Sequence, residues 1–192
     1  MATKRKLAVP KLKGESETLE ALAKALKKSE KAALVDVILE LAKDNQTTLR
    51  SLMRRFDVQL SEQGLIEETK KAIVAATDFD ECESNYNFDY DSVAYDSIER
   101  NFRKLIQDGH LAEVMQMSLE LMRLGSRQVE MSDEGMMTDE IADCLKVVIA
   151  SLKKSDLPKS QVVKWCDDMT KNDCVGFICD SELSSLRKAS QQ

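Results

Sequence analysis

The sequence predicts an all-α protein, and three of its features support that class. Glycine and proline number only six and two in 192 residues, too few for the many turns of an all-β fold. Apolar residues recur three and four positions apart along most of the chain, as on the buried face of an amphipathic helix. The longest uninterrupted apolar stretch, Ala72 to Ala76, is far shorter than the roughly 20 residues of a membrane helix. We therefore expect a soluble, cytoplasmic protein without a membrane span or a secretion signal.

The first 15 residues predict a basic, disordered N-terminal arm. Within residues 1–13 there is no acidic residue, and the basic ones are Lys4, Arg5, Lys6, Lys11 and Lys13. The rest of the chain has 23 basic and 34 acidic residues, a formal charge of −11. Because such a body repels a phosphate backbone, we do not expect nucleic-acid binding beyond a few salt-sensitive contacts of the arm.

Residues 16–189 are expected to form one helical domain, which begins with four helices before residue 77. The break at Lys28 and Ser29 is short enough for the first two helices to form an antiparallel pair. Ser29 is the expected N-cap of the second helix, since its hydroxyl can accept a hydrogen bond from a first-turn amide. The fourth helix runs from about Ser61 to Ala76. The apolar positions of the four are Leu19, Leu22, Leu26; Leu34, Val35, Ile38, Leu41, Ala42; Leu49, Leu52, Met53, Phe56; and Leu65, Ile66, Ile73, Val74.

An acidic, aromatic connector is expected at about residues 77–90, after which the helical spacing resumes. Gly109 should end the next helix inside a tight hairpin, because glycine readily adopts the left-handed conformation that stops a helix. Further helices are expected at about residues 111–122, 137–152, 158–169 and 175–189. Eight or nine helices, in pairs of about 35 to 45 residues, indicate antiparallel hairpins in an irregular bundle or a short α-solenoid-like stack.

Two stretches resemble the helical region that follows the SWIM zinc finger in bacterial SWIM-domain proteins. They are EKAALVDVILELAKDNQTTLRSLMRRF, from Glu30 to Phe56, and YDSVAYDSIERNFRKLIQDGHLAEVMQMSLELM, which begins at Tyr90. The resemblance covers residues 17–170 and implies an all-helical module used for protein contacts, with no family catalytic residues to transfer. The finger itself is absent, because its two cysteines one residue apart and its Cys-x-His pair are not found, so no zinc or DNA-binding role carries over.

Aromatic side chains interleaved with acidic ones form the candidate partner-binding site. Residues 77–99 contain eight acidic residues, no basic residue and the three tyrosines of the chain. Aromatic anchors ringed by carboxylates suit recognition of a basic peptide or protein, although the rings could instead attach the connector to the core. A methionine cluster could line an adaptable groove or fill the core. The candidate residues are Tyr86, Asp89, Tyr90, Asp91, Tyr95, Met115 and Met122.

Little in the sequence indicates catalysis or a cofactor. His110 is the only histidine, and no phosphate-binding glycine loop is present. The cysteines lack a zinc-binding spacing, which indicates free thiols in a reducing compartment; they are Cys82, Cys144, Cys166, Cys174 and Cys179. We therefore favour a non-enzymatic helical protein–protein interaction module. The alternative is a carboxylate-dependent divalent-metal hydrolase that uses the acidic residues from Asp78 to Glu83.

Overall fold

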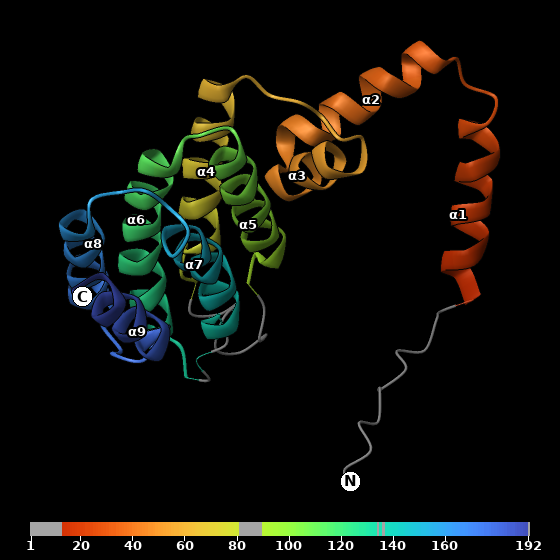
Figure 1. Ribbon diagram of the computed structural model, residues 1–192. Helices are drawn as coiled ribbons and strands as arrows, with labels where there is room; N and C mark the ends of the chain where they lie inside the picture. The colour runs from red at the N-terminus through yellow and green to blue at the C-terminus, as the bar shows by residue number, and fades with distance from the viewer. Residues whose placement is uncertain (1–12, 81–89, 134, 136, 192) are drawn as a thin grey trace, which may run out of the picture. The chain divides into compact units, whose positions relative to one another are not determined.

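The computed structural model is all-helical throughout the residues it describes, which are 13–80, 90–133, 135 and 137–191 (Figure 1). This confirms the predicted fold class. Nine helices lie within these residues, and none has the length and apolar character needed to cross a membrane. They are α1 (Lys13–Leu26), α2 (Lys31–Asp44), α3 (Gln46–Arg55), α4 (Glu62–Ala76), α5 (Ser92–Gln107), α6 (Leu111–Met131), α7 (Thr138–Leu152), α8 (Lys159–Asn172) and α9 (Asp180–Gln191).

The chain divides into two compact units at a boundary inside α3. The N-terminal unit comprises Met1–Leu49 and the C-terminal unit comprises Arg50–Gln192. The connector expected at 77–90 therefore lies within one unit and does not separate two. Of this connector, the structure describes residues 77–80 and residue 90.

The N-terminal unit contains α1, α2 and the first residues of α3. From residue 17 to the end of α2, Ala42 is the one buried residue. The predicted antiparallel pair is not formed, because α1 and α2 do not pack along their lengths. The predicted cap is also wrong. The Ser29 hydroxyl donates to the Ala25 carbonyl at 3.2 Å, within the last turn before the break, and Glu30 takes the N-cap position of α2 without a side-chain hydrogen bond.

Six helices of the C-terminal unit form three consecutive pairs, α4 with α5, α6 with α7 and α8 with α9, stacked side by side in two layers (Figure 1). One layer contains α4, α6 and α8, and the other contains α5, α7 and α9. Each helix contacts its pair partner and the next helix of its own layer. Of the two predicted arrangements, an irregular bundle and an α-solenoid-like stack, these contacts are those of a stack, in which each pair buries its apolar side against its neighbour.

A single apolar core runs through this stack. Its largest fully buried side chains are Ile73, Tyr95, Ile98, Phe102, Leu105, Leu121, Met122, Met137, Ile141, Leu145, Met169 and Ile178. Trp165 of α8, the only tryptophan, is also buried, and its indole N–H lies 3.2 Å from the Met115 carbonyl and 3.3 Å from the Ser118 hydroxyl of α6. A buried indole needs such a hydrogen-bond acceptor, so this contact fixes α8 against α6.

Two glycines serve different purposes in the C-terminal unit. Gly109 follows α5 with a φ of 93°, the left-handed conformation predicted for it. Gly125 lies inside α6 and faces α7, where a Cβ atom would stand 2.8 Å from Cδ1 of Ile141. The absence of a side chain at Gly125 therefore lets α6 and α7 approach each other closely.

Candidate functional site

The structure describes five of the seven candidate residues, since Tyr86 and Asp89 lie outside the described residues. Tyr95, Met115 and Met122 are buried in the core. A buried side chain does not contact a partner while the stack is closed, so we remove these three from the candidate partner-binding surface. They take the core-filling role that the sequence had left as the other possibility.

Tyr90 and Tyr95 attach the start of α5 to α6 and α7. Their rings meet edge to face, with centroids 6.1 Å apart. The Tyr90 hydroxyl hydrogen-bonds the Glu140 carboxylate, and the Tyr95 hydroxyl donates to Oε1 of Gln128 at 2.8 Å. Burial raises the pKa of Tyr95 far above its usual value, so its hydroxyl remains a neutral donor. Both rings therefore serve the packing of the stack.

Gln128 of α6 connects Tyr95 to the end of α4. Its side-chain N–H groups donate to the carbonyls of Ala76 at 3.0 Å and Asp78 at 3.4 Å, while its oxygen accepts from Tyr95. Because the amide is buried, these bonds satisfy groups that water does not reach. Gln128 thus fixes the point at which the connector leaves α4. The sequence analysis missed it, since a lone glutamine inside a helix belongs to no pattern.

Asp91 is a structural residue in two respects. Its Oδ1 accepts a hydrogen bond from the Ala94 amide at 2.9 Å and caps α5. Its Oδ2 lies 3.2 Å from Nη1 of Arg50, whose Nε lies 3.3 Å from Oε1 of Glu68. The Arg50 side chain is only 2% exposed, so two carboxylates neutralise a buried cation. Asp91 is therefore engaged within the molecule, where it holds Arg50 of α3 to α5.

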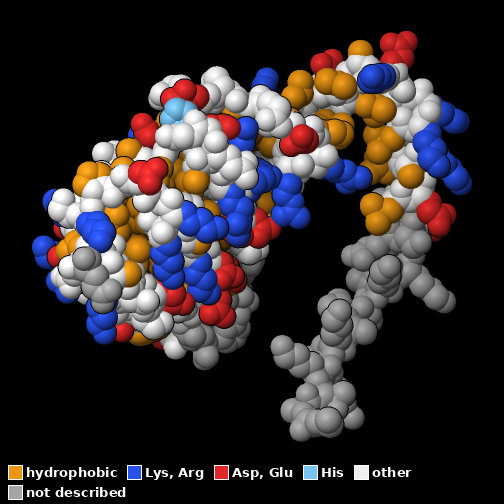
Figure 2. All heavy atoms as spheres, in the orientation of Figure 1, with side chains coloured by type: hydrophobic (Ala, Val, Ile, Leu, Met, Phe, Trp, Pro, Cys, Tyr) orange, Lys and Arg blue, Asp and Glu red, His pale blue; other side chains and the backbone are white. Residues whose placement is uncertain are grey.

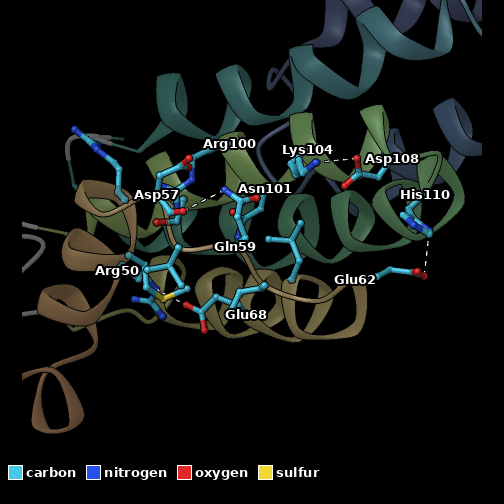
Figure 3. Close-up of a pocket in the computed structure, with 16 residues that line it drawn as sticks. Arg50, Asp57, Gln59, Glu62, Glu68, Arg100, Asn101, Lys104, Asp108 and His110 are labelled. Carbon is cyan, nitrogen blue, oxygen red and sulfur yellow. Dashed lines mark hydrogen bonds and ion pairs between the residues drawn. The ribbon is translucent and has the colours of Figure 1, made fainter. Parts of the chain in front are cut away.

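A polar pocket of about 380 Å³ lies beside Arg50, between the last residues of α3 and helices α4 and α5 (Figure 3). Several of its charges pair with one another. Nζ of Lys104 lies 2.9 Å from Oδ1 of Asp108, and Nδ1 of His110 lies 3.4 Å from Oε1 of Glu62. Four acidic and four basic side chains line the pocket, so the formal charges of its Asp, Glu, Lys and Arg residues balance.

A second hollow, of about 360 Å³, is an apolar groove between α4 and α6, which we call the α4–α6 groove. Its floor consists of the buried side chains of Ile66, Ile73 and Met117, and Val74 stands at its edge with 64% of its surface exposed. Its polar rim consists of Lys70, Glu113, Gln116 and Glu120. An apolar floor inside a polar rim is the usual anatomy of a protein-binding surface.

Three buried thiols of the C-terminal unit, those of Cys144, Cys166 and Cys179, are protonated near neutral pH. Burial raises the pKa of Cys166 and of Cys179 to about 11 in each case, and it raises the pKa of Cys144 further. Cys174 is the exposed thiol among the described cysteines, all of which are free. Three of the four described cysteines, Cys144, Cys166 and Cys179, are buried in the core.

The acidic cluster predicted as an alternative metal site is only partly described. Asp78 and Asp80 lie in the described residues, whereas Glu81 and Glu83 do not. Within the part of the chain that the structure covers, no three His, Cys, Asp or Glu side chains are gathered in a way that could hold a metal ion. The hydrolase alternative stays a prediction.

No protein-family model, no curated protein and no solved structure matches this chain. The resemblance to the SWIM-associated helical region therefore stays a prediction. Within the described part of the C-terminal unit, the α4–α6 groove is a surface that brings apolar and charged side chains together.

Proposed function

We propose that this protein is a non-enzymatic helical protein-interaction module whose α4–α6 groove binds a basic amphipathic helix of another protein. The observation that carries the proposal is Val74, an exposed apolar side chain at the edge of a buried apolar floor. An isolated valine on a surface is unremarkable, but one continuous with the floor of a groove adds apolar area that a partner can cover.

The shape of the groove favours a helix as the ligand. The groove lies between two neighbouring helices of one layer, and Ile66, Ile73 and Val74 of α4 face Met117 of α6 across it. A ridge of apolar side chains spaced three and four residues apart fits the space between two helices, as in helix-in-groove recognition. An extended strand has no such continuous ridge on one side.

The charge of the C-terminal unit favours a basic partner. Residues 50–192 contain 27 acidic and 18 basic residues, a formal charge of −9. At the rim itself Glu120 pairs with Arg123 at 2.6 Å and Glu113 stands against Lys70, so the attraction comes from the unit as a whole. Opposite charge accelerates the encounter of two proteins and selects the orientation of the ligand, whereas the apolar floor supplies most of the binding free energy.

The proposal is tested with a synthetic helical peptide of leucine and lysine that has one apolar face, and with a scrambled peptide of the same composition that has none. Binding is measured by isothermal titration calorimetry. We expect the amphipathic peptide to bind more tightly than the scrambled one, and Val74→Glu to weaken it about tenfold, since the substitution places a charge in the apolar contact.

Phe177→Glu provides the matched control, because Phe177 is 58% exposed and lies outside the groove. Both substitutions add one negative charge, so a purely electrostatic attraction would increase equally in the two variants. Equal affinity for the two peptides, or wild-type affinity in the Val74→Glu variant, would refute the proposal.

A further inference from the structure

The N-terminal unit exposes most of its apolar side chains. On α1 these are Leu19, Leu22 and Leu26, which we call the leucine face of α1; on α2 they are Val35, Val37, Ile38, Leu39 and Leu41. Each is between 40% and 64% exposed. Figure 2 shows hydrophobic side chains gathered along α2 and on one side of α1, with lysines on the other side of α1. Two helices of 14 residues without a covered apolar face are marginal on their own.

From residue 17 to the end of α1, the charged side chains lie away from the leucine face. At 100° per residue, Glu17, Glu20 and Lys24 project from the side of the helix opposite Leu22. The leucine face can therefore be covered without removing a charge from water, which would otherwise oppose association.

The apolar surface of α2 is wider than one neighbouring helix covers. Val35 and Leu39 lie on one side of Ile38, and Val37 and Leu41 lie on the other, so the apolar arc spans about 200° at 100° per residue. An ordinary helix that packs on one side needs an apolar stripe of about 100°. The sequence of α2 is therefore suited to contact with two helices at once.

We propose that the N-terminal unit is a self-association element in which α1 and α2 of two copies pack as an antiparallel four-helix assembly. The apolar area supports a second copy as the occupant. The eight exposed side chains amount to about 700 Å² per copy, close to the roughly 800 Å² per partner of a standard interface. The two helices also have equal lengths, so two copies supply four helices of matched length.

The charges of the two helices also favour a second copy. Residues 17–44 contain six acidic and five basic residues, so two copies approach without strong repulsion. The C-terminal unit has fewer exposed large apolar residues among its described residues, six in all: Phe56, Val58, Leu60, Val74, Met131 and Phe177. The self-association surface and the α4–α6 groove involve different residues, and neither proposal rests on the other.

The orientation of the α1 helices follows from their sequence. Leu19 stands three residues before Leu22, and Leu26 stands four residues after it. Two antiparallel α1 helices that cross at Leu22 therefore place Leu19 of one copy near Leu26 of the other. The same orientation opposes the two helix dipoles, whereas a parallel pair would align them.

The oligomeric state of the full chain tests the proposal. Light scattering coupled to gel filtration should give twice the 21.6 kDa of one chain, and Leu22→Glu with Ile38→Glu should give the single mass. Both side chains lie in the N-terminal unit, so the emission of the buried Trp165 should show that the C-terminal unit of the variant remains folded. The matched control replaces two exposed apolar residues of the C-terminal unit, Val74→Glu with Phe177→Glu, and should remain a dimer.

Cysteine cross-linking tests the orientation in a background that carries Cys82→Ser and Cys174→Ser. Leu22→Cys should form an interchain disulfide under mild oxidation, because the Cα atoms of a disulfide stand about 4.4 to 6.8 Å apart. Glu20→Cys, on the other side of the same helix, should not. A mixture of Leu19→Cys and Leu26→Cys chains should cross-link to each other more than either does to itself.

Two results would overturn the proposal. One is a full-length chain that is monomeric at every accessible concentration, which would mean that the leucine face is covered in another way. The other is a dimer whose mass the Leu22→Glu and Ile38→Glu pair leaves unchanged, which would place the interface elsewhere. Preferential cross-linking of Leu19→Cys to itself would contradict the antiparallel orientation.

Discussion

Gly125 determines how closely two helices of the stack approach each other. A Cβ atom there would lie 2.8 Å from Cδ1 and 3.1 Å from Cγ1 of Ile141, and Ile141 is fully buried. The side chain that must yield is therefore itself enclosed by the core. In an exposed helix the change from glycine to alanine would stabilise by about 1 kcal/mol, so at this position two opposed effects compete.

We expect Gly125→Ala to destabilise the protein by about 1 to 2 kcal/mol, because overpacking of a closed core outweighs the gain in helix propensity. Urea denaturation measures the change. In an Ile141→Val background, which removes the overlapping methyl group, the same substitution should become neutral or stabilising. An equal effect in both backgrounds would show that the contact with Ile141 is not the cause.

Residue type alone did not reveal which candidate residues are buried. Tyr95, Met115 and Met122 are all amphipathic or adaptable side chains that suit a core and a binding surface equally. A signal was nevertheless present, since Tyr95 stands three residues before Ile98 and seven before Phe102, on one helical face. That spacing indicates a core position for Tyr95, whereas the acidic residues near it in the sequence indicate an exposed one.

At the scale of helices, Arg50 attaches α3 to α4 and α5. Besides its ion pairs with Glu68 and Asp91, its Nη2 lies 3.5 Å from the Lys71 carbonyl. All three partners lie far from Arg50 in the sequence. A buried ion pair contributes little net stability by itself, but its loss leaves charges without a partner.

Arg50→Met should therefore destabilise the C-terminal unit by about 2 to 4 kcal/mol, because Glu68 and Asp91 lose their counter-charge. Chemical denaturation monitored at Trp165 gives the value. The companion variant Arg50→Met with Glu68→Leu should recover part of the loss, since it removes one of the stranded carboxylates. An unchanged midpoint for Arg50→Met would contradict this account.

Helix boundaries were predictable where a local rule applies. Gly109 follows α5 in the left-handed conformation, and the Ser61 hydroxyl accepts from the Gly64 amide at 3.2 Å as an N-cap of α4. Ser29 fits the same rule in the sequence, yet its hydroxyl donates to the carbonyl of Ala25, which precedes it. Serine can serve the helix before it or the one after it, and the sequence does not distinguish these two uses.

At the scale of the whole molecule, burial of thiols makes stability depend on alkaline pH. The pKa of Cys166 and of Cys179 rises from 9.0 to about 11 on folding because burial disfavours the thiolate. The unfolded chain therefore loses these protons first as the pH rises. The stabilisation that these two thiols provide is complete below about pH 9 and is lost as the pH rises from about 9 to about 11.

We expect the free energy of unfolding of the wild type to fall from pH 8 to pH 10.5 by about 4 kcal/mol more than that of the Cys166→Ala and Cys179→Ala double variant, about 2 kcal/mol for each thiol. Urea denaturation at the two pH values gives the comparison. Other groups that ionise in this range are present in both proteins and cancel in the difference. Parallel curves would show that these thiols do not contribute.

The general architecture was predictable, and the surfaces were not. Regular helical spacing and few turn-forming residues were sufficient for the all-α class, but they left an irregular bundle and a stack of pairs as alternatives. The boundary between Leu49 and Arg50 lies inside a helix, where no linker composition marks it. The α4–α6 groove joins residues as distant as Val74 and Met117, so only the packing of α4 against α6 creates it.

The single tryptophan makes the C-terminal unit optically distinguishable from the N-terminal unit. Trp165 is buried against Met115 and Ser118 of α6, within the stack of the C-terminal unit. Its emission therefore reports on the closure of α6 and α8 alone, whereas the far-ultraviolet dichroism of the peptide groups sums over every helix of the chain. When unfolding is followed by both signals, the two units can be distinguished without a label. If the dichroism falls before the indole emission shifts, the helices that unfold first lie outside the α6–α8 contact.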